Sequence, residues 1–212
     1  MTSDRIRIKF CGITRLEDAL EAVALGVDAL GFVFHAASPR YVEPAVARGI
    51  VAQLPAFVTA VGLFVDRPLA EVREVMATTR MGLAQFHGEE SASYCRDYAA
   101  PYLKAVRVTN AEAVTLAAGA YPDAAALLLD TWHPQLAGGT GLAFDWRLIP
   151  ANCAKPLVLA GGLDASNVAR AITQAHPYAV DVSGGIEATK GIKDGDKMRA
   201  FVAEVRRIER EY

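Results

Sequence analysis

Short apolar segments alternate with amphipathic segments eight times along this chain of 212 residues, and this alternation constrains the fold more than any other feature. The apolar segments are near-continuous runs rather than strict alternations, as expected for strands that are buried on both faces of a parallel sheet. Each amphipathic segment then serves as the crossover helix that a parallel connection requires. The expected strands are residues 6–12, 29–34, 58–65, 83–87, 103–108, 124–130, 157–161 and 179–183. The expected helices are residues 16–25, 44–54, 68–79, 89–98, 111–119, 145–149, 165–175 and 196–210, with Thr14 as the N-cap of the first.

The spacing of the strand ends separates two architectures that both contain parallel sheets. Five intervals between successive ends are 20–23 residues long and two are 31 residues long. Eight such units close into a barrel, whereas a doubly wound open sheet normally ends at five or six strands. The sequence therefore predicts the α/β class, with a single (β/α)8 TIM barrel that forms one domain over residues 1–212.

The two long intervals place extended loops at residues 35–43 and 131–144. Both loops follow strands, so they lie at the C-terminal end of the barrel, where active sites of barrel enzymes are found. Such loops can be surface decoration, but in a compact domain they more often cover or bind a ligand. We therefore expect both loops to contribute to a site.

Composition excludes several classes of function. The net charge is −2 and acidic and basic residues are interspersed, so nucleic acid is not an expected partner. No apolar run approaches the roughly 18 residues that cross a bilayer, so no membrane association is expected. The cysteines Cys11, Cys95 and Cys153 fit neither a disulfide framework nor a zinc site, which favours a reducing cytoplasm. The histidines are scattered, and no metal site is predicted.

Two reactive side chains end strands. Cys11 ends the first strand, and Asp130 follows three leucines at the end of the sixth, so both can point into the mouth of the barrel. A carboxylic acid held away from water can donate a proton near neutral pH, and a thiolate beside Lys9 or another cation can accept one. By residue type alone, Cys11 would be a small buried hydrophobe and Asp130 a loop cap or ion-pair partner. Their positions favour acid–base chemistry, whereas Cys95 and Cys153 are expected to pack.

Paired glycines follow the last two strands, in Gly161-Gly162 and in Asp181-Val182-Ser183-Gly184-Gly185. Glycine lets backbone N–H groups approach an oxyanion closely, and barrels often bind phosphate after strands 7 and 8. One pair alone would indicate only a turn. Two pairs at these strands favour a phosphate ligand.

Further polar residues occupy the same end of the predicted barrel. Arg40, in the first long loop, can offer a planar fork to a carboxylate, although a solvated loop arginine is the default interpretation. His87 ends the fourth strand and can act as a second acid or base, as an orienting donor, or as a hydrogen-bonded histidine at a helix start. Gln85 is expected to support it. Gly139 and Gly141 lie in a glycine-rich stretch that we interpret as a lid segment able to reach the phosphate.

Several segments together resemble the phosphoribosylanthranilate isomerase family, in family order and over essentially the whole chain. They are residues 9–14 (KFCGIT), 31–34 (GFVF), 38–41 (SPRY), 61–65 (VGLFV), 85–88 (QFHG), 128–130 (LLD), 138–141 (GGTG), 144–146 (FDW), 159–163 (LAGGL) and 180–187 (VDVSGGIE). The chain departs from the family at Gly184, where serine is more usual, and at Phe10 and Phe86, where leucine or isoleucine is frequent.

The resemblance implies a cofactor-independent Amadori rearrangement of N-(5′-phosphoribosyl)anthranilate in tryptophan biosynthesis, by a monomer or homodimer whose partner is this small-molecule substrate. Asp130 would be the general acid and Cys11 the general base. Arg40 would hold the anthranilate carboxylate, and the glycine loops would hold the phosphate.

Three other readings remain at this point. A related indoleglycerol-phosphate synthase would use a lysine and a glutamate at strand ends, and no such pair is evident. A sugar-phosphate isomerase of histidine biosynthesis would use two aspartates, where this chain has Cys11 and Asp130. A catalytically silent phosphate-binding barrel would keep the glycine loops without needing either reactive group.

Overall fold

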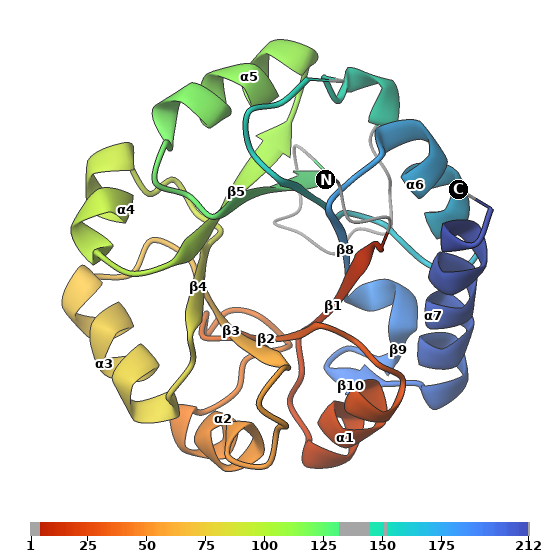
Figure 1. Cartoon of the computed structure of the whole chain (residues 1–212). Coiled ribbons are helices and arrows are strands. Elements are labelled where there is room, and N and C mark those ends of the chain that lie inside the picture. Colours follow the sequence, from red (N-terminus) through yellow and green to blue (C-terminus); the bar gives the residue numbers. More distant parts are fainter. Residues whose placement is uncertain (1–4, 132–144, 151, 212) are drawn as a thin grey trace.

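Eight parallel strands close into a barrel in the computed structural model, which describes residues 5–131, 145–150 and 152–211 (Figure 1). Each strand pairs with the next along the chain, and β1 closes the barrel by pairing with β8. The strands are β1 (Arg7–Cys11), β2 (Ala29–Val33), β3 (Thr59–Phe64), β4 (Leu83–Phe86), β5 (Tyr102–Val108), β6 (Ala126–Thr131), β7 (Leu157–Leu159) and β8 (Ala179–Val182). The predicted barrel is confirmed, with each strand inside or within one residue of its expected range.

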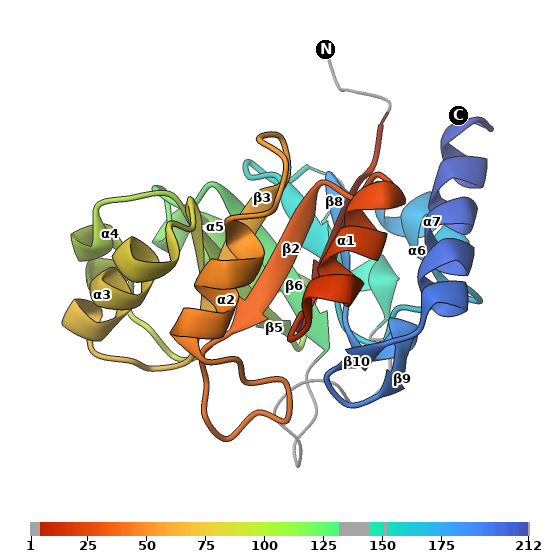
Figure 2. The ribbon, with the colours of Figure 1, turned by 90° about the horizontal axis from the view of Figure 1, so that it is seen from below.

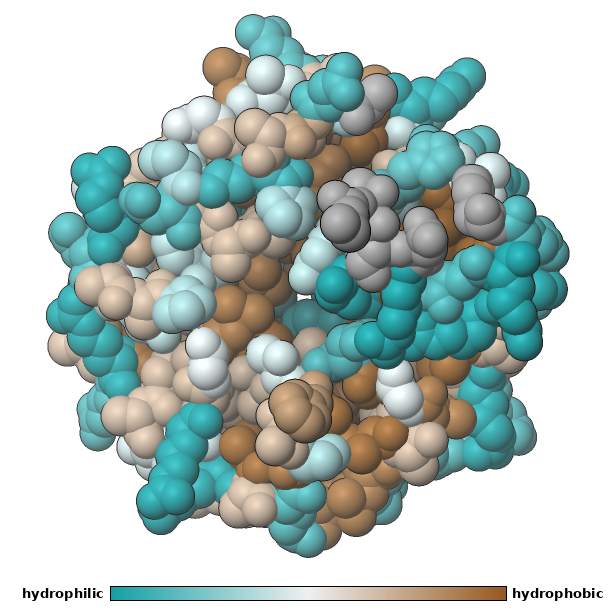
Figure 3. Space-filling view, in the orientation of Figure 1, coloured by the Kyte–Doolittle hydropathy of each residue, from teal (hydrophilic) through white to brown (hydrophobic). Residues whose placement is uncertain are grey.

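Helices surround the barrel in the order that the sequence predicts (Figure 1). They are α1 (Leu16–Ala24), α2 (Pro44–Val51), α3 (Leu69–Thr79), α4 (Ala92–Tyr98), α5 (Ala111–Ala120), α6 (Val168–Ala175) and α7 (Gly195–Glu209), with the 3-10 helix η1 (Trp146–Leu148) between β6 and β7. Hydrophilic side chains gather over the part of the molecule where α6 and α7 lie (Figure 3). Among the helices of these described ranges, none has both the length and the apolar character needed to cross a bilayer.

Helix starts are where prediction and structure differ most. The prediction of Thr14 as an N-cap is wrong: Arg15 holds that position without a side-chain cap, and the Thr14 hydroxyl donates to the carbonyl of Gly191. The helix expected from residue 89 begins at Ala92, because the Ser91 hydroxyl caps it by accepting from the Tyr94 N–H. The bond of Thr14 to the distant Gly191 therefore removes it from the start of α1, and the local Ser91 cap sets the start of α4.

A short hairpin after β8 was not predicted. The 3-10 helix η2 (Gly184–Ile186) leads into β9 (Glu187–Thr189), which pairs antiparallel with β10 (Ile192–Lys193). The hairpin lies at the same end of the barrel as the loop between β2 and α2 (Figure 2). Its two strands are too short for a periodic signal in the sequence, yet it carries two residues of the site described below.

Most buried apolar residues form two layers, and a third small cluster contains Cys11, Val33 and Leu63. The larger layer fills the space between the strands and the helices. A smaller cluster comes almost entirely from strand residues, among them Val61, Leu103 and Leu128, and fills the interior of the barrel. Among the described residues, the barrel interior is thus packed with side chains.

Replacing Leu128 with alanine should destabilise the protein by about 2–5 kcal/mol, because the side chain is fully buried and its removal leaves a cavity inside the barrel. Urea unfolding measures the loss. Leu116→Ala is the matched control, because Leu116 is 64% exposed on α5 and should lose far less. Equal losses in the two variants would contradict the packed interior.

Candidate active site

The predicted site residues within the described ranges lie at the C-terminal ends of the strands or in the loops that follow. They form two groups. One gathers around β1 and β8 and contains Cys11, Arg40, Asp181, Ser183, Gly184 and Gly185, with Gly161 and Gly162 in the neighbouring loop after β7. The other lies across the barrel mouth and contains Gln85, His87 and Asp130. Gly139 and Gly141 lie outside the described residues.

A buried ion pair lies next to Cys11. Lys9 and Cys11 are two residues apart on β1, so their side chains share the inner face of the barrel. The Lys9 Nζ donates to Asp181 Oδ1 at 2.8 Å, and both side chains are less than one-tenth exposed. Asp181 was predicted as a ligand contact, and the structure shows it as the partner of Lys9.

The thiol experiences two opposing influences. Burial raises the pKa of Cys11, and the ammonium groups of Lys9 and Lys193 act in the opposite direction. Burial alone would lower the pKa of Lys9, but Asp181 and Cys11 together outweigh burial and raise that pKa. The cations expected to favour a thiolate are therefore present, although burial and the Asp181 carboxylate together outweigh them.

Arg40 already faces a carboxylate. Its Nε and Nη2 donate to the two carboxylate oxygens of Glu187 at 2.7 and 2.8 Å, a bidentate pair that raises the pKa of Arg40. This pair uses two of the five N–H donors of a guanidinium, so Arg40 retains donors for a second anion. Glu187 appeared in the sequence only as the last letter of a motif, and no sequence signal pointed to this contact.

Lys193 links the ends of the first and last strands of the barrel. Its fully buried ammonium donates to the carbonyl oxygens of Cys11 and Ser183 at 2.6 and 3.2 Å, and to Glu187 Oε1 at 3.0 Å. Burial lowers the pKa of Lys193 despite the nearby Glu187 carboxylate. Sequence reasoning missed this residue because the hairpin that carries it was not predicted.

The two glycine segments meet, as the phosphate prediction requires. A Cβ on Gly185 would lie 2.0 Å from the carbonyl oxygen of Leu163, so only glycine allows the loops after β7 and β8 to approach this closely. Beside them, the buried Ser183 hydroxyl has no hydrogen-bond partner among the described residues. A buried polar group without a partner needs an explanation, and a bound ligand supplies one.

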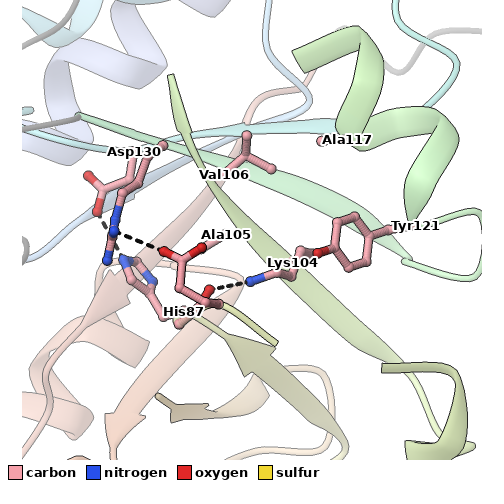
Figure 4. Close-up of a pocket in the computed structure, with 10 residues that line it drawn as sticks. His87, Lys104, Ala105, Val106, Ala117, Tyr121 and Asp130 are labelled. Atoms are coloured by element: carbon pink, nitrogen blue, oxygen red, sulfur yellow. Dashed lines mark hydrogen bonds and ion pairs between the residues drawn. The ribbon is translucent and has the colours of Figure 1, made fainter. Parts of the chain in front are cut away.

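A hydrogen-bonded chain runs along the other side of the mouth. The His87 and Asp130 side chains point toward one another, with His87 Nε2 3.0 Å from Asp130 Oδ2 (Figure 4). Gln85 Nε2 lies 2.9 Å from His87 Nδ1, so with this amide orientation Nδ1 accepts and the Nε2–H donates to Asp130. His87 and Asp130 also line a cavity of about 220 Å³.

This arrangement is suited to proton transfer with an anion held at one side. A carboxyl group and a thiol end strands on opposite sides of the mouth, and cations surround the thiol. Within the part of the chain that the structure describes, no group of His, Cys, Asp and Glu could hold a metal ion. The geometry thus offers acid–base chemistry on a substrate that bridges the mouth.

The Arg40–Glu187 contact should make stability depend on pH. Arg40 and Lys193 outweigh burial and lower the pKa of Glu187 below its ordinary value of 4.5. Ionised Glu187 therefore stabilises the fold above that value, and this contribution is lost as pH falls through the lower folded-state pKa. Between about pH 5 and pH 3, the free energy of unfolding should fall more steeply in the wild type than in Glu187→Gln. Denaturant titrations at both pH values test this, with exposed Glu74→Gln as the control, and equal slopes would contradict it.

Comparison with known proteins adds an independent line of evidence. The family model described as N-(5′phosphoribosyl)anthranilate (PRA) isomerase matches residues 8–204. The N-(5′-phosphoribosyl)anthranilate isomerase of Pseudomonas aeruginosa (strain UCBPP-PA14) is 56% identical over 201 residues, which cover 95% of each chain.

Solved structures agree with the sequence comparison. The crystal structure of phosphoribosyl anthranilate isomerase from Thermotoga maritima superposes with a TM-score of 0.88 at 41% identity, covering 95% of this chain and 98% of that one. A second isomerase structure, in complex with reduced 1-(o-carboxyphenylamino)-1-deoxyribulose 5-phosphate, gives a TM-score of 0.82 at 39% identity with the same coverage. The chain described here therefore belongs to the N-(5′-phosphoribosyl)anthranilate isomerase family.

Proposed function

We propose that this chain isomerises N-(5′-phosphoribosyl)anthranilate to 1-(2-carboxyphenylamino)-1-deoxyribulose 5-phosphate in tryptophan biosynthesis. The observation that carries the proposal is the placement of a thiol and a carboxyl group on opposite strands of one barrel mouth, in a member of this family. The solved relative that holds a reduced form of this product supports the same substrate class. An internal shift of hydrogen from C2 to C1 balances the reaction.

Asp130 acts first in the proposed mechanism, as the general acid. Its carboxylic acid gives a proton to the ribose ring oxygen while the bond from C1 to that oxygen breaks, and the ring opens to a Schiff base. The His87 contact at 3.0 Å orients the carboxyl group at the mouth of the barrel, where the substrate is proposed to lie. A positioned acid of this kind contributes roughly 10²- to 10⁴-fold to the rate.

Cys11 acts second, as the general base. Its thiolate takes the proton from C2 of the ring-opened substrate, and the electrons of that bond form the C1–C2 double bond of an enolamine. Tautomerisation then places hydrogen on C1 and gives the ketone. Proton return from Cys11 and to Asp130 restores the starting states. Because this role needs a reduced thiol, the proposal favours a cytoplasmic location.

The ends of the substrate are proposed to bind beside the thiol. Arg40 uses its remaining donors for the anthranilate carboxylate, and Asp181 and Ser183 line the same side of the mouth. The loops with Gly161, Gly162, Gly184 and Gly185 hold the phosphate, and Gly139 and Gly141 remain predicted contacts. The excess of cations over carboxylates around Cys11 supports binding of an anionic substrate here. We propose a monomer or a homodimer, to be distinguished by sedimentation.

Removing either proton-transfer group should lower turnover strongly. Cys11→Ala and Asp130→Asn should each reduce kcat by roughly 10²- to 10⁴-fold, with smaller changes in KM, because only proton transfer is lost. The decrease in phosphoribosylanthranilate fluorescence measures both constants. Cys95→Ala is the control for losing a buried thiol elsewhere and should retain the wild-type kcat. Wild-type turnover in either purified site variant would refute its assigned role.

Arg40 should act mainly through binding. Arg40→Ala removes the donors for the substrate carboxylate, so KM should rise by roughly tenfold or more, in line with the loss of a charged hydrogen bond. Arg40→Lys keeps the charge but not the planar fork, and should recover only part of the affinity. An unchanged KM in Arg40→Ala would exclude Arg40 from substrate binding.

A further inference from the structure

Lys9 and Cys11 meet over a glycine. Residue 31 on β2 is the register partner of Cys11, and it is glycine. A Cβ at that position would lie 2.9 Å from Cys11 Sγ and 3.1 Å from Lys9 Nζ, closer than side-chain atoms normally approach. The space left by the missing side chain is therefore where the thiol and the ammonium come together.

The ammonium is also held in place from the other side. Asp181 on β8 is the register partner of Lys9, and its carboxylate accepts a hydrogen bond from Nζ at 2.8 Å. Lys9 is 4% exposed, so a cation here would be costly without that partner. The hydrogen bond to Asp181 uses one of the three donors of the ammonium group, and the space over Gly31 brings Nζ close to Cys11 Sγ.

The charges around the thiol sum in favour of its anion. Three cations, Lys9, Lys193 and Arg40, and two carboxylates, Asp181 and Glu187, form one connected set of ion pairs and contacts around Cys11. With a neutral thiol this set carries one excess positive charge, and with a thiolate it is neutral. Loss of the thiol proton therefore leaves this buried set neutral, and this offsets part of the cost of burying the thiolate.

We propose that Lys9 is a positioning residue of this enzyme: anchored by Asp181 and given room by Gly31, it holds the Cys11 thiolate in place. The inference rests on the proposed role of Cys11 as the base. Lys9 itself does not take the C2 proton of the substrate. Its ammonium group donates to Asp181, and Lys9 lies two residues before the C-terminal end of β1, deeper in the barrel than Cys11. The proposal also explains why a lysine–aspartate pair occupies the barrel interior next to an apolar cluster.

The test is the pH dependence of Cys11 alkylation by iodoacetamide, read at the Cys11 peptide by mass spectrometry without reference to activity. In Lys9→Met the midpoint of the profile should move to higher pH, and the rate at pH 8 should fall by roughly tenfold, as expected for loss of a charge-assisted hydrogen bond. Lys9→Arg should return the midpoint toward the wild-type value, because it restores the charge. A Lys9→Met midpoint equal to that of the wild type would overturn the proposal.

A second buried lysine–carboxylate pair provides the matched control. Lys104 and Glu90 are 2.9 Å apart and as buried as Lys9 and Asp181, but Lys104 lies on β5, four strands from β1. Lys104→Met should cost similar stability and leave the Cys11 midpoint unchanged. An equal shift in both variants would show a general loss of packing and overturn the specific role of Lys9.

Two further variants keep the test decisive if Lys9→Met fails to fold. The double variant Lys9→Met with Asp181→Asn removes both buried charges, and Gly31→Ala separates the thiol from the ammonium with both charges retained. Each should raise the alkylation midpoint, and a wild-type midpoint in either folded protein would overturn the proposal. The outcome is independent of the proposed function, since full turnover in Cys11→Ala would refute the base role without altering the alkylation profiles.

Discussion

The pairing of β1 with β8 is the constraint on which the site depends. Closure of the barrel places Lys9 beside Asp181, although 172 residues separate them in the chain. Because all eight strands are parallel, their C-terminal ends form one rim, and residues that end different strands converge there. Lys193 reinforces the closure by donating to carbonyl groups at the ends of both strands. The contact that completes the fold is therefore also the one that assembles the thiol side of the site.

Buried charge distinguishes the site from the rest of the barrel interior. Burying an ion costs several kcal/mol even when it is paired, and apolar residues can often replace a buried pair without loss of stability. The Lys104–Glu90 pair compensates for this cost with structural contacts, because Lys104 donates to carbonyl groups of Phe86 and Gly88 and thereby orders the loop after β4. The set around Cys11 instead carries one excess positive charge while the thiol is neutral, which packing does not explain and the proposed thiolate does.

The sequence predicted what depends on local pattern and missed what depends on distant partners. Near-continuous apolar runs predicted all eight strands, and the ends of those runs correctly located Cys11, His87 and Asp130 at one rim. Thr14 was misassigned because its hydroxyl bonds to Gly191, which a local capping rule cannot foresee. Likewise, Arg40 could be recognised as a carboxylate binder, but its internal partner Glu187 depends on a hairpin too short to leave a periodic signal.

The proposed chemistry requires both reactive groups to hold protonation states opposite to their usual ones. A cysteine in water is mostly protonated at neutral pH and an aspartate is mostly ionised, so a cysteine base and an aspartic acid donor each need an environment that works against this tendency. The structure gives them different environments. Cys11 lies among Lys9, Lys193 and Arg40, whose charges favour an anion. Asp130 meets the His87 ring, which a buried amide holds from its far side. Separating the groups across the barrel mouth keeps the carboxyl group away from the cations around the thiol, so the two groups have different electrostatic surroundings.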